Sequence, residues 1–196
     1  MKILCLNNND VAKELFEWIQ NQGHDVTIIS KQLNAEWCRE NDFDLTVSYT
    51  YRYIIPKEIL DMLGNNVVNL HISYLPWNRG ADPNLWSILE GTPRGVTLHY
   101  ITPGLDKGDI IAQRLVADNP EQSSLSDTYN NLDKAAKELF KEAFAYYEYW
   151  NDMRKKAVVE GTYHSLADAI SIKDKIDTWD ISVEDLRRIC SDENNR

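Results

Sequence analysis

Short apolar runs alternate with helix-like segments along the first half of the chain. The apolar runs have the length and residue types of buried β-strands, and they cover residues 2–6, 25–30, 44–49 and 67–71. Between them, apolar residues at helical spacing predict three helices. Asp10 can cap the first, the second covers residues 34–41, and Pro56 suits the first turn of the third. Strands that alternate with helices favour right-handed crossovers. We therefore expect an α/β fold with a doubly wound, mostly parallel sheet covered on both faces.

The second half of the chain predicts two more strands and one long helix. The strands cover residues 95–101 and 109–116, and they flank the turn TPGLDKGD. Residues 124–150 carry an apolar stripe at helical spacing, which we expect to pack in the core. The stripe consists of Tyr129, Leu132, Ala136, Leu139, Phe140, Ala143 and Tyr147.

The tail of the chain is more polar than the part before it. Ser182 and Asp185 have the spacing of a helix cap, and residues 191–196 are expected to be disordered. We predict one domain over residues 1–150 and a C-terminal extension over residues 151–196. The extension could be a small subdomain, a dimerisation arm of a homodimer or a cover for the edge of the sheet.

Composition narrows the classes of function. A chain of 196 residues with 43% hydrophobic and 27% charged residues suits a globular protein with a full core. The formal net charge of −10 disfavours nucleic acid as a partner, because each phosphate contact needs Lys or Arg. We expect no signal peptide, since no basic segment leads into a longer apolar run at the start of the chain. We expect no membrane partner, since no apolar run approaches the ~20 residues of a membrane helix. Three cysteines, widely separated and odd in number, indicate reduced thiols and a cytoplasmic location.

Candidate chemistry begins at the end of the fourth predicted strand. Asn69 and His71 are two residues apart, so their side chains share a face of the sheet about 6.6 Å apart at ~3.3 Å per residue. They lie at the carboxyl end of the strand, where open α/β sheets bind ligands. Two structural interpretations stay open for the pair: Asn69 could cap a turn, and His71 could be a hydrogen-bonded histidine of the core.

Two acids in the turn TPGLDKGD strengthen the functional interpretation. Asp106 and Asp109 lie beside Gly104 and Gly108, which indicate a turn with unusual backbone angles. Taken alone, the acids would be turn-forming residues. Together with the amide and the imidazole, one of them completes a group suited to a reaction that passes through an oxyanion while a proton leaves.

Other kinds of site lack support in the sequence. No serine or cysteine stands in a G-x-S-x-G elbow, so an acyl-enzyme is not indicated. The segment LNNND after the first strand lacks the glycines that a dinucleotide pyrophosphate requires. His24, His99 and His164 have no partner at metal-ligand spacing, so we expect no metal and interpret each as structural or surface. Direct group transfer between two bound substrates is the chemistry that remains.

The combined pattern N-x-H, LP-x-x-RG and GLD-x-G-D resembles the folate-dependent formyltransferases. That family includes methionyl-tRNA, glycinamide ribonucleotide and sugar-nucleotide formyltransferases. The strong match runs from Tyr49 to Gln113; the first half agrees with a Rossmann-like organisation, and the tail after Trp150 matches only loosely. The resemblance implies that residues 1–150 are the formyltransferase catalytic domain.

By this resemblance, the donor is N10-formyltetrahydrofolate and the acceptor is a primary amine. The family's catalytic Asn, His and Asp fall on Asn69, His71 and Asp106. The first two would stabilise the tetrahedral oxyanion, and Asp106 would hold the imidazole charged and help to remove the amine proton. The resemblance also implies a folate-binding slot formed by Tyr53, Ile54, Ile55, Thr102, Pro103, Gly104 and Asp109.

The loop LPWNRGADPNLWSI is most similar to sugar-nucleotide N-formyltransferases, which implies a UDP- or dTDP-linked 4-amino-deoxysugar of lipopolysaccharide or surface-glycan biosynthesis. Trp77 and Trp86 offer flat faces for a ring, and Arg79 could pair with a pyrophosphate or brace the loop. Asn78, Asp82 and Asn84 could bond sugar hydroxyls or shape the turn around Pro83, and Gly80 is the remaining substrate-binding candidate.

Two departures from the family bear on the acceptor. Ile72 stands where the family often has proline, which should change the rigidity of the loop and leave the chemistry intact. The chain ends soon after the catalytic domain, whereas the methionyl-tRNA enzymes carry a further C-terminal domain. With the charge of −10, this makes us expect an acceptor other than tRNA.

Other functions stay open at this point. A glycinamide ribonucleotide or methionyl-tRNA type enzyme would keep the donor and change the acceptor. A formyltetrahydrofolate hydrolase would use water, although the known type carries an additional regulatory domain. A non-catalytic folate or nucleotide sensor would not need Asn69, His71 and Asp106, which are all present.

Overall fold

The structure is a computed structural model that describes residues 1–64 and 66–191. The disorder expected near the C-terminus falls on residues 192–196, which lie outside the described residues, while Ser191 ends a helix. The chain forms two compact units. Unit 1 consists of Met1–His71, Leu98–Ala112 and Phe140–Lys156. Unit 2 consists of Ile72–Thr97, Gln113–Leu139 and the chain from Ala157 onwards.

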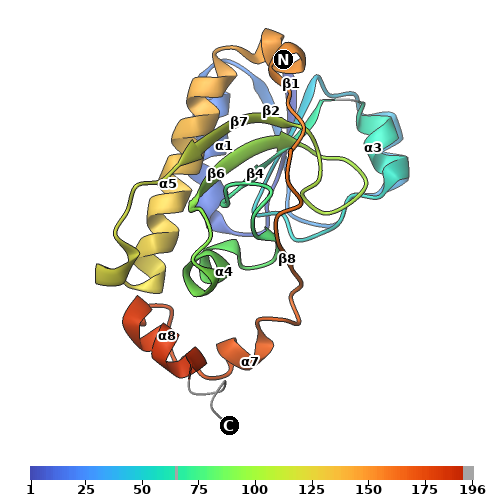
Figure 1. Cartoon of the computed structure of the whole chain (residues 1–196). Coiled ribbons are helices and arrows are strands. Elements are labelled where there is room, and N and C mark those ends of the chain that lie inside the picture. Colours follow the sequence, from blue (N-terminus) through green and yellow to red (C-terminus); the bar gives the residue numbers. More distant parts are fainter. Residues whose placement is uncertain (65, 192–196) are drawn as a thin grey trace. The chain divides into compact units, whose positions relative to one another are not determined.

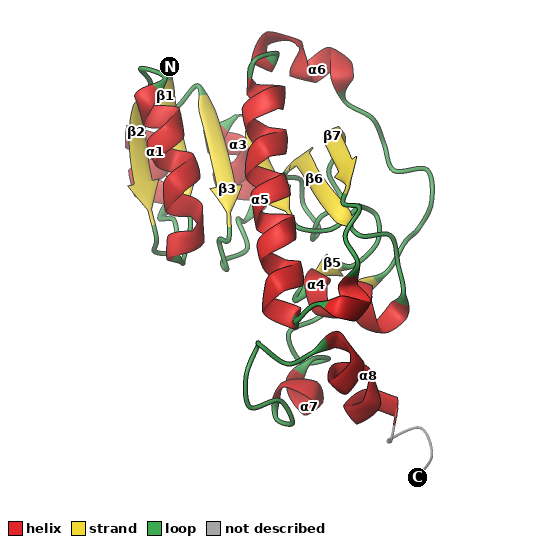
Figure 2. Ribbon diagram, turned by 90° about the vertical axis from the view of Figure 1, so that its left-hand side faces the viewer, coloured by secondary structure: helices red, strands yellow, loops and turns green. Residues whose placement is uncertain are grey.

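The strands of the large sheet follow the predicted apolar runs closely. They are β1 (Lys2–Leu6), β2 (Asp25–Ile29), β3 (Leu45–Tyr49), β4 (Val67–His71), β6 (Gly95–Tyr100) and β7 (Ile110–Leu115). Their order is β2-β1-β3-β4-β6-β7, and the first four strands of the chain pair in parallel (Figure 1, Figure 2). The predicted α/β class, with a mostly parallel sheet, is confirmed.

Two of the helical segments between the first strands begin after an asparagine whose side chain satisfies a free backbone donor. The segments are η1 (Asp10–Ala12), α1 (Lys13–Asn21), α2 (Ala35–Glu40) and α3 (Lys57–Leu63). Asn34 caps α2 by accepting the Trp37 N–H at 3.0 Å. The first helical turn, η1, begins at Asp10, and its cap is Asn9 rather than Asp10 as expected: the Asn9 side chain accepts the N–H of Val11. The proline at 56 occupies the capping position of α3 rather than its first turn.

Strand β1 contributes side chains to both faces of the sheet of unit 1. Leu4 and Leu6 belong to an apolar cluster that α2 and α3 complete. Ile3 and Cys5 point the other way and are also fully buried. Helices α1 and α3 lie on opposite sides of β1 and β3 (Figure 1, Figure 2). Burial on both faces explains why the strands are almost continuously apolar.

The helix predicted over residues 124–150 ends earlier than expected. This segment contains α5 (Leu125–Phe144), η3 (Tyr147–Tyr149) and the start of α6 (Trp150–Met153). The Trp150 indole N–H donates to the Ala143 carbonyl at 2.9 Å, an acceptor that a continuing helix would offer to the N–H of Tyr147. Core packing of the predicted stripe is confirmed for Leu132, Ala136, Leu139, Phe140 and Ala143.

Unit 2 combines a two-stranded sheet with short helices. Besides most of α5, its elements are β5 (Arg79–Gly80), α4 (Pro83–Glu90), η2 (Pro120–Gln122), β8 (Tyr163–His164), α7 (Ile170–Lys173) and α8 (Val183–Ser191). Leu85 and Ile88 of α4 form a core with Val183 and Leu186 of α8. The predicted cap of α8 is confirmed, since the Asp185 N–H donates to Ser182 Oγ at 3.0 Å. Within the described residues, no helix combines the length and apolar character needed to cross a membrane.

Candidate active site

Strand β4 brings Asn69 and His71 to its carboxyl end. Its apolar residues are buried and fix the strand in the sheet, while Asn69 is half-buried and His71 is buried. The strand pairs in parallel with β3, so that Asn69 lies opposite Ser48. Because side chains alternate along a strand, the amide and the imidazole project from the same face.

The turn that follows β6 brings a carboxylate to this pair. Asp106 Oδ2 lies 3.7 Å from His71 Nε2, and the two side chains are only 10% and 9% exposed. Asp106 and Gly104 have φ values of 50° and 112°, in the left-handed region that most residues avoid. At Gly108, a Cβ would lie 1.7 Å from the Tyr100 carbonyl oxygen, so only glycine permits this close approach. The glycines thus shape the turn that carries Asp106.

His99 on β6 joins the same group of side chains. Its Nε2 atom lies 3.3 Å from Asn69 Nδ2 and 3.5 Å from Asp106 Oδ1. Its ring meets the His71 ring edge-on, with the centroids 6.4 Å apart. The sequence did not associate His99 with the site, since it has no partner close to it in the chain. The one local signal is a titratable residue inside a strand whose other residues are uncharged.

These residues supply the groups that an addition to a carbonyl requires. An amide N–H and a protonated imidazole stabilise a negative oxygen when both are held in place and shielded from water. A carboxylate accepts a proton from an attacking nucleophile, directly or through one water molecule. Asn69, His71 and Asp106 are all shielded from water over most of their surface, so little reorganisation is needed for such a reaction.

The second acid of the turn, Asp109, interacts with the tail. Asp109 Oδ2 lies 3.3 Å from Arg154 Nε, and the guanidinium lies 4.3 Å from the centre of the Tyr100 ring. Burial raises the pKa of Tyr100, and the nearby Arg154 opposes that shift. Lys155 also pairs with Ile110 at the start of β7 through backbone bonds of 2.7 and 2.8 Å. Residues 154–155 therefore hold the end of the turn.

The residues predicted to bind folate lie in two loops of unit 1. The loop after β3 contains Tyr53, Ile54 and Ile55. Ile54 is 76% exposed, whereas Ile55 is buried and belongs to the apolar cluster with α3. The loop after β6 contains Thr102, Pro103 and Gly104, close in sequence to Asp106. A ligand site at the carboxyl end of β3 has the location usual for open α/β sheets.

The predicted acceptor residues lie in unit 2, where Asn78 and Arg79 brace their own loop. The Asn78 side chain is fully buried; it donates to Thr92 Oγ1 at 2.7 Å and accepts from Thr162 Oγ1 at 2.9 Å. Arg79 Nε donates to the Thr162 carbonyl at 3.3 Å. At Gly80, φ is 92° and a Cβ would lie 2.2 Å from a carbonyl of β8. Of the two roles considered for Asn78, this geometry favours shaping the turn. Trp77, in the same loop, is half-buried.

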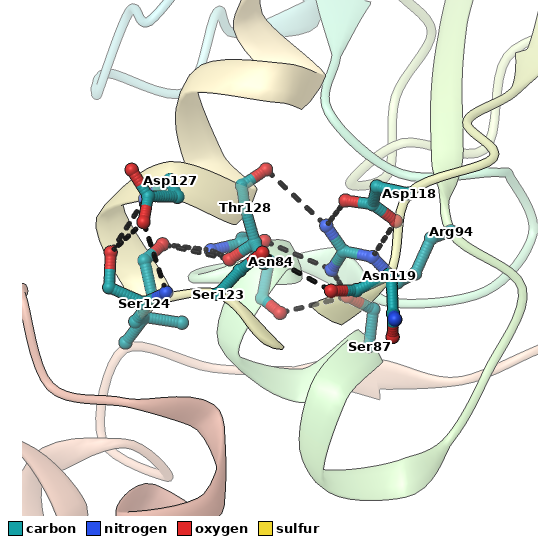
Figure 3. Close-up of polar contacts among 10 residues, drawn as sticks. Asn84, Ser87, Arg94, Asp118, Asn119, Ser123, Ser124, Asp127 and Thr128 are labelled. Atoms are coloured by element: carbon teal, nitrogen blue, oxygen red, sulfur yellow. Dashed lines mark hydrogen bonds and ion pairs between the residues drawn. The ribbon is translucent and has the colours of Figure 1, made fainter. Parts of the chain in front are cut away.

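Asn84 belongs to a buried polar cluster at the start of α4, shown in Figure 3. Its Nδ2 donates to the Leu125 carbonyl at 3.0 Å, and its Oδ1 accepts from Arg94 Nη1 at 3.1 Å. Arg94 also makes a two-point ion pair with Asp118, with N–O distances of 3.1 and 2.9 Å. Asn84 therefore ties α4 to the start of α5, which favours the structural role considered for it.

Asp82 and Trp86 contact the tail within unit 2. Asp82 precedes α4 with a φ of 52°, and its Oδ2 lies 2.6 Å from Lys173 Nζ. The Trp86 ring stacks on the His164 ring at 3.9 Å and 8°. His164 Nε2 in turn lies 3.0 Å from Glu90 Oε1. One face of the Trp86 ring is covered, so a bound ring would have to use the other face.

Within the part of the chain that the structure describes, no group of three or more His, Cys, Asp and Glu side chains is arranged to hold a metal ion. The polar groups near Asn69 are an amide, two imidazoles and one carboxylate. Their chemistry is that of hydrogen bonding and proton transfer.

The chain is similar to known formyltransferases in sequence and in structure. The model of the Formyl transferase family matches residues 3–144. The formyltransferase PseJ from Anoxybacillus kamchatkensis, solved with UDP-4,6-dideoxy-4-formamido-L-AltNAc and tetrahydrofolate, is 39% identical, with a TM-score of 0.81 over 95% of this chain and 97% of that one. A 4-N formyltransferase from Francisella tularensis is 25% identical, with a TM-score of 0.75 over 95% of this chain and 86% of that one.

The curated relatives are matched over a smaller part of their length. The methionyl-tRNA formyltransferase of Syntrophus aciditrophicus (strain SB) is 40% identical over 92 residues, which are 45% of this chain and 30% of that protein. The chain spans less than half the length of the curated relatives that it matches. The two solved structures named above are matched over most of both chains.

Proposed function

Since this chain belongs to the formyl transferase family, we propose that it moves a formyl group from N10-formyltetrahydrofolate to the primary amine of a nucleotide-linked amino sugar. The observation that carries the proposal is the convergence of three side chains. Asn69 and His71 share a face at the end of β4, and Asp106 Oδ2 lies 3.7 Å from His71 Nε2. The family's three catalytic residue types thus meet at one place in unit 1.

The proposed reaction is a direct attack. The amine nitrogen adds to the formyl carbon, and the carbonyl oxygen becomes an oxyanion that accepts hydrogen bonds from Asn69 Nδ2 and from protonated His71. The carboxylate of Asp106 pairs with that imidazolium and takes the proton of the amine, directly or through water. The bond from the formyl carbon to N10 then breaks, and N10 takes up the proton. The products are a formamide and tetrahydrofolate.

Folate binding is assigned to the two loops of unit 1 that contain Ile54 and Pro103. The exposed Ile54 side chain offers apolar surface to a planar ring. Asp109 Oδ2 pairs with Arg154 and the Asp109 carbonyl accepts from the N–H of Tyr100, so Asp109 would contact a ligand through its second carboxylate oxygen. Holding the donor on rigid loops would keep the formyl carbon within reach of the catalytic side chains.

The acceptor is assigned by likeness and by the chemistry of the loop in unit 2. PseJ, which was solved with a UDP-linked formamido sugar, is 39% identical over nearly the whole chain, and this favours a UDP- or dTDP-linked 4-amino-deoxysugar. Trp77, Arg79 and Trp86 remain the candidates to contact the nucleotide or the sugar. We assign residues 1–150 as the catalytic domain and residues 151–196 as its extension. A homodimer, a cytoplasmic location and a role in surface-glycan biosynthesis stay predictions.

The methionyl-tRNA type is the second candidate, because curated relatives carry that name. The formal charge of −10 weighs against it, since tRNA binding depends on contacts between cations and phosphates.

The test is absorbance-monitored release of tetrahydrofolate in the presence of a panel of amines. The panel holds UDP- and dTDP-linked 4-amino sugars, glycinamide ribonucleotide and methionyl-tRNA. We expect release that depends on one amino sugar and falls by ~10²–10³ in Asn69→Ala, the usual effect of losing one oxyanion donor. Asn130→Ala, the same substitution at an exposed position of α5, is the control and should keep the native rate.

Each alternative gives a different result in this assay. Release with methionyl-tRNA or glycinamide ribonucleotide alone would transfer the proposal to that acceptor. Release without any amine would identify a hydrolase. Binding of folate without release under any condition would contradict catalysis and leave the sensor.

A further inference from the structure

We propose that His99 is a positioning residue that orients the amide of Asn69 for the transfer reaction. This inference rests on the proposed function, because it concerns the same site. It begins with an unusual feature of β6, which is that a histidine only 1% exposed lies within reach of two of the predicted catalytic side chains. A buried imidazole must find partners for both ring nitrogens.

The hydrogen bonds of His99 define which nitrogen carries the proton. Nδ1 lies 2.9 Å from the carbonyl oxygen of Tyr100, and a carbonyl oxygen can only accept. Nδ1 is therefore the donor. In the neutral ring, Nε2 is then a bare acceptor, and it faces Asn69 Nδ2 at 3.3 Å. The Asn69 amide donates one of its two N–H groups to His99.

This bond settles which way the Asn69 amide points. An asparagine amide can be rotated by half a turn with little change in shape, which exchanges its NH₂ group and its oxygen. An acceptor at Nε2 holds the NH₂ group on the side of His99 and leaves the second N–H of the same nitrogen for the formyl oxygen. The opposite orientation would present a carbonyl oxygen to a developing negative charge and would oppose the reaction.

The neighbouring charge gives the arrangement a second constraint. Asp106 Oδ1 lies 3.5 Å from His99 Nε2, slightly beyond normal hydrogen-bonding distance. If Nε2 carried a proton, it would donate to Asp106 and could no longer accept from Asn69. Nε2 can therefore either accept the Asn69 N–H or carry a proton, but not both. The arrangement that suits the transfer reaction is the neutral ring with its proton on Nδ1.

Two substitutions separate this role from a structural one. His99→Gln places an amide oxygen near the position of Nε2, which preserves an acceptor for Asn69 and gives up the donor to the Tyr100 carbonyl. His99→Asn keeps a donor near the position of Nδ1 and has no atom that reaches Asn69. We expect His99→Gln to retain most of the native kcat. We expect kcat of His99→Asn to fall about 10²-fold with KM for both substrates little changed, the size of effect that misplacement by ~1 Å produces.

The reverse order, in which His99→Asn is active and His99→Gln is not, would overturn the proposal, because anchoring the Tyr100 carbonyl would then be the function of His99. Equal kcat values for the two variants would overturn it as well. Circular dichroism and the thermal midpoint of each variant show whether it has folded.

A measurement on the native protein tests the proposal without turnover or substitution. In protein labelled with ¹⁵N, the chemical shifts of the His99 ring should show a protonated Nδ1 and an unprotonated Nε2. A scalar coupling between Asn69 Nδ2 and His99 Nε2 should report the hydrogen bond between them. A proton on Nε2 of the neutral ring would refute the assignment. Absence of tetrahydrofolate release from the native protein with every amine would instead refute the proposed function.

Discussion

Removing the charge of Arg94 should destabilise unit 2 strongly. The guanidinium and the Asp118 carboxylate form a two-point ion pair, and each side chain is only 9% exposed. The same guanidinium donates to Asn84 Oδ1, to Ser87 Oγ and to the Thr128 carbonyl, at 3.1, 2.8 and 3.3 Å (Figure 3). Arg94→Met would keep most of the side-chain volume and leave Asp118 buried without its cation.

The expected size of the effect follows from burial. Breaking a buried ion pair by removing one partner typically costs about 3–5 kcal/mol, because the remaining charge is uncompensated. For a chain of 150–250 residues, each kcal/mol lowers the melting temperature by ~2–4 °C. We therefore expect Arg94→Met to melt roughly 6–20 °C below the native protein.

Thermal and urea unfolding followed by circular dichroism would measure this loss. Adding Asp118→Asn to Arg94→Met should recover part of the stability, since the double variant no longer buries an unpaired charge. Arg39→Met is the control, because Arg39 pairs with Glu58 at 3.8 Å with both side chains more than half exposed. That change should cost less than ~1 kcal/mol.

Two results would refute this reasoning. One is an Arg94→Met protein that unfolds within ~1 kcal/mol of the native protein, as an exposed pair would. The other is a double variant whose loss equals the sum of the two single losses, which would mean that the two groups do not interact.

Three further predictions address other parts of the chain. Gly108→Ala should lower kcat by up to ~10²-fold and reduce the melting temperature, because its Cβ would lie 1.7 Å from the Tyr100 carbonyl oxygen; steady-state kinetics with unchanged kcat would contradict this. Asp127 accepts hydrogen bonds from the side chain and the backbone of Ser124, and these bonds, the side-chain one most, lower the pKa of Asp127. The ionised carboxylate therefore stabilises the fold above the unfolded pKa of Asp127, and this contribution is lost as pH falls through the folded pKa. Ser124→Ala should raise that pKa toward its unfolded value in a ¹³C NMR titration, and an unchanged titration would contradict the assignment. Burial raises the pKa of the Cys5 thiol to about 12, so Cys5 should react with Ellman's reagent only after unfolding; labelling of Cys5 in the native protein at pH 8 would contradict this.

The sequence predicted the strands well because buried parallel strands leave a strong local signal. Runs such as 2–6 and 67–71 are almost wholly apolar and are bounded by polar residues, so their limits match β1 and β4. Helix ends carried less information. At the end of α5 the Ala143 carbonyl accepts from the N–H of Tyr146 and from the indole N–H of Trp150, and the apolar spacing is compatible with a longer or a shorter helix.

The candidate site was predictable where it depended on local spacing. Asn69 and His71 share a face because of the two-residue period of a strand, and Gly104 indicated the turn that carries Asp106. His99 was not predicted, because its nearness to Asn69 depends on which strands become neighbours in the sheet.

Contacts between distant segments of unit 2 could not be predicted from the sequence either. The pairing of β5 with β8 joins Arg79 to Tyr163 and has only two residues in each strand, too few for a periodic signal. The roles of Asn78 and Asn84 likewise depend on partners such as Thr162 and Arg94. A polar residue in a loop suggests a ligand when its structural partners cannot be seen in the sequence.

Isotope tracing can show whether the formyl group of the donor ends on the amino sugar. The protein would be incubated with N10-formyltetrahydrofolate labelled with ¹³C in the formyl group and with a UDP-linked 4-amino sugar, and the products would be observed by ¹³C NMR. We expect the label to appear as a formamide carbon on the sugar nitrogen, and Asn69→Ala to produce this signal at a rate lower by ~10²–10³. Label found only as free formate, or as a formamide formed equally fast by Asn69→Ala, would contradict the proposed transfer.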